Sequence, residues 1–235
     1  HCYSFWGWKR WYKNRPKKLS EKELERLTRL FVRRIADGIG PEKDIPAPDV
    51  NTNPKVMSWI VDEYSTITGK SSPAVVTGKP IDKGGSQGRL EATGLGGVYT
   101  LLVLVKRVKL DPQKLTVAVE GFGNVGRFTA YFLQQEGFKV VALSDSKGGI
   151  YIPNGVAPIE QVEKCKEEKG FLAGCYCVGS VCDIRFKDRV HGQNVSPVEV
   201  LELPIDIVVP AALENVITKE NAEKIQAKIV LEMAN

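Results

Sequence analysis

The chain has 235 residues, of which 43% are hydrophobic, and carries a formal charge of +5 at pH 7. This composition suffices for one large domain or two small ones, and it excludes a disordered or fibrous protein. No apolar run approaches the ~20 residues that a membrane helix needs, and residues 1–20 lack the apolar stretch of a secretory signal, so the sequence predicts a cytoplasmic protein. Much of the positive charge lies near the N-terminus, at Lys9, Arg10, Lys13, Arg15, Lys17 and Lys18.

Two helices are predicted in the first third of the chain. Ser20 and Glu23 form a capping box, and apolar side chains recur at helical spacing after it until Gly38 ends the run. Four prolines make residues 41–54 a loop whose backbone angles are restricted. A second helix is expected over residues 55–67.

The remainder of the chain predicts a parallel sheet. Residues 71–89 are rich in Gly, Ser and Pro and are the expected crossover between two domains, which we place at 1–80 and 81–235. Beyond them, helical and strand patterns alternate as in βαβ units, so the predicted fold class is α/β with a Rossmann-like parallel sheet. The predicted helices cover residues 91–108, 125–136 and 218–227, and the predicted strands cover 115–120, 139–144, 205–209 and 228–231.

A glycine-rich motif lies between the first predicted strand and its helix. Gly121, Gly123 and Gly126 form G-x-G-x-x-G, and Asp145 ends the next strand. The first glycine permits a tight turn, the second lets the backbone approach a pyrophosphate, and the third lets helix and strand pack closely. Asp145 is expected to accept hydrogen bonds from the ribose hydroxyls and to repel a 2′-phosphate, which favours NAD over NADP. The alternative is a doubly wound domain with an incidental glycine loop.

Several separate motifs resemble those of the hexameric glutamate dehydrogenases. They occur in the family's order and near its spacing: PAPDVNT (46–52), GGSQGRLEATG (84–94), GFGNVG (121–126), SDSKGGIY (144–151), PAALENVIT (210–218) and EMAN (232–235). The resemblance implies the C-terminal part of an α/β substrate domain followed by a Rossmann-like domain that is truncated at its C-terminus. It also implies oxidative deamination of glutamate to 2-oxoglutarate and ammonia with hydride transfer to NAD, or NADP, and a homohexameric full-length protein.

The same resemblance assigns roles to individual residues. Asp49 matches the family's proton-shuttling aspartate, and Arg89 matches a residue that binds the substrate α-carboxylate, with Ala47 beside the substrate. Lys79 is expected to be a solvated loop lysine. The implied cofactor-binding residues are Thr93, Gly121, Phe122, Gly123, Asn124, Val125, Gly126, Asp145, Ser146, Ala211, Ala212, Asn215 and Asn235. Met233 stands where the family usually has glycine, which argues against close cofactor approach there.

The first 15 residues depart from the family. A glycine-rich loop with a catalytic lysine precedes PKKLS in the family, whereas this chain has Trp6, Trp8 and Trp11 among basic residues. Because TGG read one base later becomes GG plus any base, each tryptophan would become glycine, and we hypothesise that residues 1–15 are a frame-shifted reading of that loop. Lacking this lysine, the chain is expected to bind dinucleotide weakly without turning over glutamate. The alternative is a genuine arm that binds nucleic acid or a membrane surface.

A second departure covers residues 171–196, where cysteines cluster. The spacing of Cys165, Cys175, Cys177 and Cys182, with His191 nearby, is not a standard structural-zinc pattern, so no metal is predicted. An odd total of five cysteines predicts free thiols, with zinc or a redox pair as alternatives. For the whole chain, the alternatives to glutamate dehydrogenase are a leucine, valine or phenylalanine dehydrogenase, or a non-catalytic module that binds dinucleotide or nucleic acid.

Overall fold

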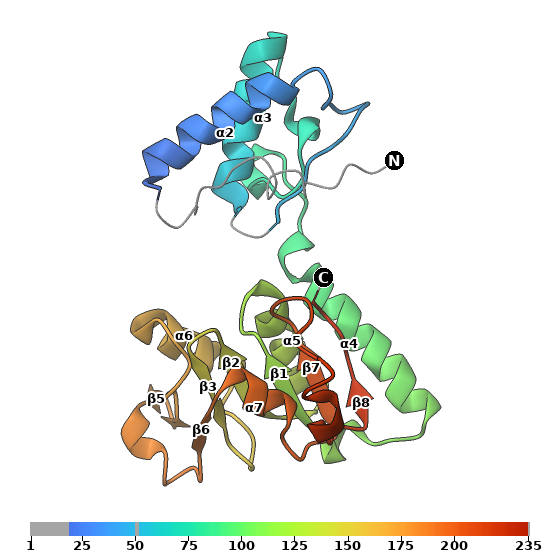
Figure 1. Cartoon of the computed structure of the whole chain (residues 1–235), viewed down its shortest axis with the longest axis vertical. Coiled ribbons are helices and arrows are strands. Elements are labelled where there is room, and N and C mark those ends of the chain that lie inside the picture. The colour runs from blue at the N-terminus through green and yellow to red at the C-terminus, as the bar shows by residue number, and fades with distance from the viewer. Residues whose placement is uncertain (1–18, 50–51, 235) are drawn as a thin grey trace. The chain divides into compact units, whose positions relative to one another are not determined.

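The computed structural model describes residues 19–49 and 52–234, and the chain divides into two compact units (Figure 1). Unit 1 is His1–Arg89 and unit 2 is Leu90–Asn235. Each unit is described by itself. The hypothesis of a frame shift in residues 1–15 and the predicted role of Asn235 both lie outside the described residues.

Unit 1 is built on two helices, α2 (Glu21–Ile35) and α3 (Pro54–Thr68), with short 3₁₀ turns η2 (Pro73–Val75) and η3 (Ile81–Lys83) after them. The capping box at Ser20 is confirmed. The Ser20 side chain accepts a hydrogen bond from the Glu23 amide, and the Glu23 side chain accepts one from the Ser20 amide. Asn53 caps α3, Pro54 occupies its first turn, and Gly69 ends it in the left-handed conformation. Both predicted helices are therefore present.

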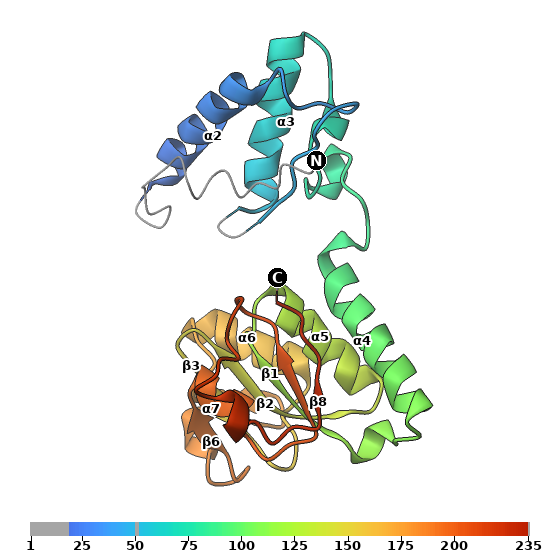
Figure 2. The ribbon, with the colours of Figure 1, turned by 45° about the vertical axis from the view of Figure 1, so that its right-hand side comes forward.

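The two helices of unit 1 pack through an apolar seam and an ion-pair cluster around the buried Glu63. Figures 1 and 2 show α2 and α3 lying against each other. Val32 of α2 and Met57 of α3 are both fully buried at this seam. Glu63 is 5% exposed, and its carboxylate meets Arg33 Nε at 2.5 Å and Arg29 Nη1 at 3.2 Å. The helix pair is thus joined by both hydrophobic burial and charge.

Unit 2 contains a six-stranded sheet of order β6-β3-β2-β1-β7-β8, which confirms the predicted α/β class. The four strands β2, β1, β7 and β8 run parallel, and at one edge β3 pairs antiparallel with β2 and β6 pairs antiparallel with β3. The strands are β1 (Thr116–Glu120), β2 (Lys139–Asp145), β3 (Gly148–Tyr151), β6 (Gln193–Val195), β7 (Ile207–Pro210) and β8 (Ile229–Val230). A separate small hairpin pairs β4 (Cys177–Val178) with β5 (Val181–Cys182).

Helices cover both faces of this sheet (Figure 2). Alternate residues of β1 face opposite layers: Val117 and Val119 join one core cluster and Ala118 joins another. The first cluster includes side chains from α4 (Arg89–Arg107), α5 (Asn124–Gln135) and α6 (Ile159–Lys169). The second includes Val200 and Leu201 of α7 (Pro197–Leu201). The sheet is therefore buried on both sides, as parallel sheets require.

The helix predicted over residues 218–227 is wrong. In its place the structure has turns and one short 3₁₀ element, η6 (Ala222–Lys224). The Asn221 side chain accepts a hydrogen bond from the Thr218 amide at 2.7 Å and donates one to the Val216 carbonyl at 2.8 Å. These local bonds offer the backbone an alternative to a helix, so the helical spacing of apolar residues was misleading here.

The prediction of free thiols in the 165–182 segment is also wrong. Cys165 is joined to Cys175, and Cys177 is joined to Cys182. The second pair lies directly across the β4–β5 hairpin, so strand pairing brings its two sulfurs together. Cys2 lies outside the described residues. Among the residues that the structure describes, no group of three or more His, Cys, Asp or Glu side chains is arranged to hold a metal ion.

Candidate functional site

A tight loop runs from the carboxyl end of β1 into α5, and it lies beside the carboxyl ends of β2 and β7. Gly121 has φ +96°, and its amide donates to the Ser144 carbonyl of β2 at 3.0 Å. A Cβ at Gly121 would lie 2.6 Å from the Ala212 amide nitrogen. A side chain at this position would thus be strained and would also collide with the chain leaving β7.

The other two glycines of the motif have opposite surroundings. A Cβ at Gly126 would lie 1.7 Å from the Gly121 carbonyl oxygen, so only glycine lets α5 sit this close to the loop. Gly123, by contrast, is exposed and faces open space on the side where a Cβ would point. The structure therefore needs glycine at 121 and 126 for packing, while packing gives no reason for glycine at 123.

The helix that follows can bind an anion. α5 begins at Asn124. Its N-cap residue is Gly123, which has no side chain to accept hydrogen bonds from the first amides of the helix. The first N–H groups of any helix lack partners inside the helix and carry partial positive charge. Together with the open approach over Gly123, this arrangement can hold a pyrophosphate.

The other residues of the glycine motif are Phe122, Asn124 and Val125, which lie between its glycines. Phe122 is 4% exposed and belongs to the first core cluster, against which Val125 also packs. Asn124 is exposed, and its side-chain amide donates to the Leu90 carbonyl at 2.7 Å, so it ties the start of α5 to the start of α4. Thr93 is exposed on α4, one residue before Gly94, where a Cβ would lie 2.8 Å from the Thr129 amide nitrogen of α5. The two helices therefore cross closely beside the glycine loop.

Asp145 lies at the end of β2, as predicted, but its carboxylate is already engaged. Oδ1 accepts the Lys147 amide at 2.8 Å, and Oδ2 accepts the Leu172 amide at 3.1 Å. Oδ2 also lies 3.4 Å from Lys166 Nζ, and only 10% of the Asp145 side chain is exposed. Ser146, the next residue, is exposed.

Lys166 is the main site residue that the sequence did not reveal. Its Nζ donates to the Phe122 carbonyl at 2.7 Å while facing Asp145, so it connects the glycine loop to the end of β2. The residue lies 44 positions from Phe122 and 21 from Asp145, in a helix that the motifs do not include. Only the folding of α6 against the sheet places this amine there.

On the other side of the glycine loop lies the chain that leaves β7. The Ala211 amide donates to the Glu120 carbonyl at 2.7 Å, and Ala212 lies against Gly121 as described above. Asn215 is exposed, with φ +61°. The fold thus brings Ala211 and Ala212 next to the glycine loop.

Met233 has a partner that explains its size. A Cβ at Gly97 of α4 would lie 2.3 Å from Met233 Sδ, so the absence of a side chain at Gly97 makes room for the methionine. Met233 packs against the first core cluster, and its amide donates to the Pro210 carbonyl at 2.8 Å. The methionine is therefore directed at α4 and its backbone extends the β7 edge.

Glu120, directly before the glycine loop, is a buried acid that the sequence analysis did not single out. It is 5% exposed, and its Oε2 has no hydrogen-bond partner among the described residues. Burial raises the pKa of Glu120 above its ordinary value of 4.5, and nearby Glu232 raises it further, while the amides of Ala212 and Ala211 partly oppose this. The only sequence signal was its place at the end of a buried strand.

The residues predicted to handle substrate belong to unit 1. Ala47 and Asp49 lie in the proline-rich loop, and both are exposed. Thr52 and Asp49 exchange hydrogen bonds of 2.7 Å between the threonine hydroxyl and the aspartate backbone, which closes the loop into a turn. Arg89 is exposed, and a Cβ at Gly78 would meet both Pro48 Cγ at 2.1 Å and Arg89 Nη1 at 3.1 Å. Arg89 therefore lies beside the loop that carries Asp49.

Lys79 differs from its expected solvated state. Its Nζ donates to the Val76 carbonyl at 2.8 Å, and the residue is partly buried. The lysine consequently stabilises the turn that leads toward η3.

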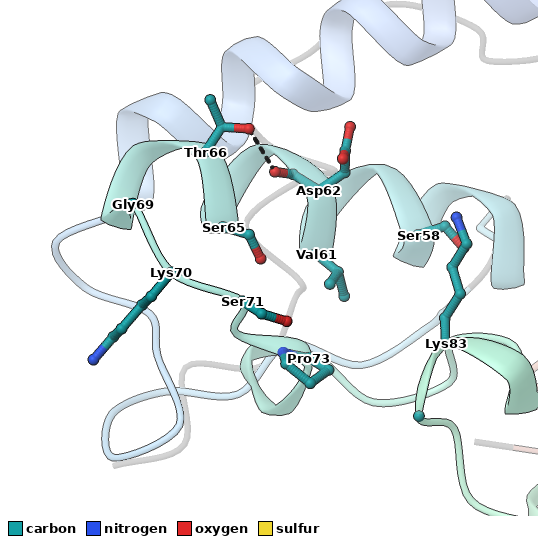
Figure 3. A pocket seen from close by; sticks show the side chains of 11 residues that line it. Ser58, Val61, Asp62, Ser65, Thr66, Gly69, Lys70, Ser71, Pro73 and Lys83 are labelled. Carbon is teal, nitrogen blue, oxygen red and sulfur yellow. Dashed lines mark hydrogen bonds between the residues drawn. The ribbon is translucent and has the colours of Figure 1, made fainter.

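Unit 1 also has an open hollow of ≈ 710 Å³ along α3 (Figure 3). Ser58, Asp62 and Thr66 line it from the helix, and Lys70, Pro73 and Lys83 line it from the segment that follows. The Thr66 hydroxyl donates to the Asp62 carbonyl, as the dashed line in the figure marks. Its lining contains none of the described residues for which we predicted a role in substrate or cofactor binding.

Comparisons with known proteins identify relatives of both units. The family model described as "Glutamate/Leucine/Phenylalanine/Valine dehydrogenase" matches residues 84–235, and "Glu/Leu/Phe/Val dehydrogenase, dimerisation domain" matches residues 9–66. The chain is 49% identical over 220 residues to the NADP-specific glutamate dehydrogenase of Synechocystis, covering 94% of this chain and 50% of that protein. It is 43% identical over 220 residues to the cryptic catabolic NAD-specific glutamate dehydrogenase of Bacillus subtilis, covering 94% and 48%.

A solved structure agrees with these relatives. The hetero-hexameric glutamate dehydrogenase of Thermus thermophilus, in a leucine-bound form, superposes with a TM-score of 0.81 at 38% identity, covering 94% of this chain and 49% of that one. The chain spans about half the length of the curated relatives it matches. Separately, none of the helices in the described residues is long and apolar enough to cross a membrane.

Proposed function

Because the chain belongs to the Glu/Leu/Phe/Val dehydrogenase family, we propose that it is part of a glutamate dehydrogenase, which oxidises glutamate to 2-oxoglutarate and ammonia. Unit 2 binds the nicotinamide dinucleotide, and unit 1, including residues 1–80, contributes to the substrate domain. When bound, the nicotinamide accepts the hydride from the amino acid. Glutamate is favoured over leucine, phenylalanine and valine, since the similar proteins of Synechocystis and Bacillus subtilis are both named glutamate dehydrogenases.

One observation carries the cofactor part of this proposal: glycine at 123 is unexplained by packing. At 121 and 126 a Cβ would collide with Ala212 and with the Gly121 carbonyl, respectively, whereas at 123 it would meet open space. A glycine that the fold does not need, at the N-cap of α5, is explained by a ligand that approaches the backbone there. Thr93, Asn124, Ala211, Ala212, Asn215 and Asn235 are proposed to line the nicotinamide side of the same ligand.

The chemistry at the substrate is assigned to unit 1. We assign Asp49 to shuttling protons between the amine, the attacking water and the product, because a carboxylate can both accept and donate at that carbon. The restricted backbone of the proline-rich loop and the Thr52 hydrogen bonds hold its main chain in place. Arg89 is assigned to the α-carboxylate, for which its planar fork is suited, with Ala47 next to the substrate.

The proposed protein is an oligomer. The similar Thermus thermophilus protein is hetero-hexameric, and the family model that matches residues 9–66 is described as a dimerisation domain. We therefore propose that the complete protein is a hexamer of identical or closely related subunits. Sedimentation of the complete protein at several concentrations measures this directly.

The test of cofactor binding uses an alanine substitution that leaves packing intact. Gly123→Ala should keep the melting temperature of the chain, because its Cβ enters open space, yet weaken NAD or NADP binding at least about tenfold by blocking the backbone approach. Gly38→Ala, in unit 1, is the matched control, since its Cβ would make only ordinary contact at 3.5 Å. Unchanged dinucleotide affinity in the Gly123→Ala chain, measured by isothermal titration calorimetry, would overturn the assignment.

The test of substrate uses the complete protein, because the chain itself is not expected to turn over glutamate, with a panel of amino acids and either dinucleotide. Glutamate should be oxidised in preference to leucine, valine and phenylalanine, and Asp49→Asn should abolish turnover while dinucleotide affinity is unchanged. The Asp49→Asn protein separates a chemical role from a structural one, because asparagine keeps the size of the side chain and removes its charge, and an unchanged melting temperature shows that the fold is intact. Faster oxidation of leucine, valine or phenylalanine than of glutamate contradicts the proposal.

A further inference from the structure

We propose that the two disulfides of residues 165–182 form a redox switch that responds to a dithiol. The dithiol opens Cys177–Cys182 first and Cys165–Cys175 second, and loss of the second bond lowers the dinucleotide affinity of unit 2. The effect on affinity rests on the proposed function, whereas the order in which the two bonds open does not depend on it.

The two pairs lie next to each other in one small part of unit 2. Cys165 lies in α6 and is joined to Cys175, ten positions later, and Cys177 is joined to Cys182, five positions later. The second pair crosses the β4–β5 hairpin, whose strands have two residues each and which is separate from the six-stranded sheet. Opening the hairpin bond therefore leaves the six-stranded sheet intact.

The two bonds differ in their access to a reductant. Cys165 and Cys175 are 3% and 0% exposed, so a dithiol in solution cannot reach either sulfur while the chain is folded. Cys177 is 9% exposed, whereas Cys182 is only partly buried and follows Val181, which is 56% exposed. Since a disulfide is broken by a thiolate that contacts one of its sulfurs, Cys182 is the first sulfur to be attacked.

The dithiol balances the exchange at Cys182. Its thiolate bonds to Cys182 Sγ, the Cys177–Cys182 bond breaks, and Cys177 leaves as a thiolate that takes up a proton. The second thiol of the reductant then loses its proton and attacks the mixed disulfide, which oxidises the reductant to a disulfide and releases Cys182 as a thiol. Each bond that opens thus consumes two electrons and two protons, all supplied by one dithiol.

Opening the hairpin gives access to the buried pair. Cys177 Sγ lies 3.9 Å from the Cys175 carbonyl oxygen, and Cys182 Sγ lies 3.8 Å from the Gln161 carbonyl oxygen of α6. The hairpin is therefore packed on the two segments that the buried bond joins. Once its own cross-link is broken, this short hairpin can separate from α6 by local unfolding, and a second dithiol reaches Cys165–Cys175 by the same exchange.

The buried pair closes the segment that contacts the glycine loop and Asp145. Lys166, next to Cys165, donates to the Phe122 carbonyl at 2.7 Å. The Leu172 amide, within the closed segment, donates to Asp145 Oδ2 at 3.1 Å. Without the bond this segment gains conformational freedom, which dinucleotide binding must then remove. Reduction should therefore weaken the binding of NAD⁺ and NADP⁺ alike.

The experiment exposes the chain to a series of dithiothreitol concentrations, alkylates the free thiols and identifies them by mass spectrometry. Cys177 and Cys182 should be alkylated at concentrations that leave Cys165 and Cys175 linked. Calorimetric titrations of the same samples with NAD⁺ and NADP⁺ should show both affinities falling about tenfold when the buried bond opens. The affinities should recover when oxidised glutathione replaces dithiothreitol and the bond forms again. The reverse order of opening, or affinities that stay within about twofold after full reduction, overturns the inference.

Paired serine variants separate the effects of the two bonds. Cys165→Ser/Cys175→Ser should bind dinucleotide as weakly as the reduced chain and should not respond to dithiothreitol. The matched control, Cys177→Ser/Cys182→Ser, should keep the affinity of the oxidised chain and lose it on reduction. A response to dithiothreitol that persists in Cys165→Ser/Cys175→Ser overturns the inference. Failure of the oxidised chain to bind either dinucleotide overturns the proposed function instead, and the order of alkylation still tests the order of opening.

Discussion

Thr116 and Asp206, 90 positions apart in the sequence, exchange three hydrogen bonds at the start of the central strands. The Thr116 amide and hydroxyl donate to Asp206 Oδ2 at 3.0 and 2.8 Å, and the Asp206 amide donates back to the hydroxyl at 3.1 Å. Directly after them Val117 pairs with Ile207 in parallel register. The pair therefore aligns β1 with β7, and these are the two strands whose far ends carry the glycine loop and Ala211.

Replacing Asp206 by alanine should destabilise the sheet. Hydrogen bonds to a charged group contribute about 1.5–3 kcal/mol each, and the partly buried Thr116 amide can regain water only in part, so we expect a loss of about 2–3 kcal/mol in the free energy of unfolding. Urea denaturation measures it, with the exposed Asp188→Ala as the control. A loss no larger than that of the control would show that the pair does not set the register.

The same substitution has a defined pH dependence. Hydrogen bonds from Thr116 lower the pKa of Asp206 below its ordinary value of 3.8, despite partial burial. A carboxyl with a depressed folded pKa contributes stability above its unfolded pKa and loses it as the pH falls through the folded value. The difference between the unaltered chain and Asp206→Ala should thus be full at neutral pH and shrink below pH 3.8.

Glu120→Gln should stabilise the protein at neutral and alkaline pH. Burial raises the pKa of Glu120, so folding favours the protonated acid, and the unaltered chain loses stability as the pH rises from 4.5 through the folded pKa. Glutamine is nearly isosteric and carries no charge, so its advantage should grow over that interval to about 1 kcal/mol or more. Thermal unfolding of both proteins between acid and alkaline pH tests this; equal pH profiles would contradict it.

Removing the carboxylate of Glu63 should loosen the helix pair of unit 1. Burial alone would raise the pKa of Glu63, but hydrogen bonds from Arg33 and Arg29 lower it below its ordinary value, so the group is charged and paired. Both arginines are partly exposed and can be resolvated, so Glu63→Ala should cost about 1–3 kcal/mol, less than the loss of a fully buried partner. Hydrogen exchange should become faster in α2 and α3, and exposed Glu42→Ala should leave it unchanged.

The two disulfides should be detectable as linked peptides. Digestion without reductant, after alkylation of the denatured chain, should yield Cys165 joined to Cys175 and Cys177 joined to Cys182. Alkylation of all five cysteines under these conditions would contradict the pairing. Because Cys165–Cys175 ties α6 to the loop that offers the Leu172 amide to Asp145, Cys175→Ser should cost roughly 2–3 kcal/mol and weaken dinucleotide binding.

Much of the fold and of the candidate site could be predicted because the signals are local. Ser20 and Glu23 need only each other to begin α2, and the strand–glycine–helix pattern around Gly121 depends on residues within one loop. Such features depend on contacts between residues that are close in the sequence, so they can be recognised without knowledge of the tertiary structure. One prediction from local pattern, the helix over residues 218–227, was wrong. There the side chain of Asn221 hydrogen-bonds to the backbone of Thr218 and Val216, and the segment forms turns instead.

The sequence alone was sufficient to predict the α/β class, the glycine loop and the family resemblance, because all three depend on short spacings. Tertiary structure decided the rest: Lys166 reaches Asp145 and the Phe122 carbonyl, Met233 occupies the space above Gly97, and the cysteines pair. These contacts join residues whose separation in the sequence carries no periodic or spacing signal. They arise only when the sheet and its helices are packed together, because packing determines which charges, sulfurs and gaps become neighbours.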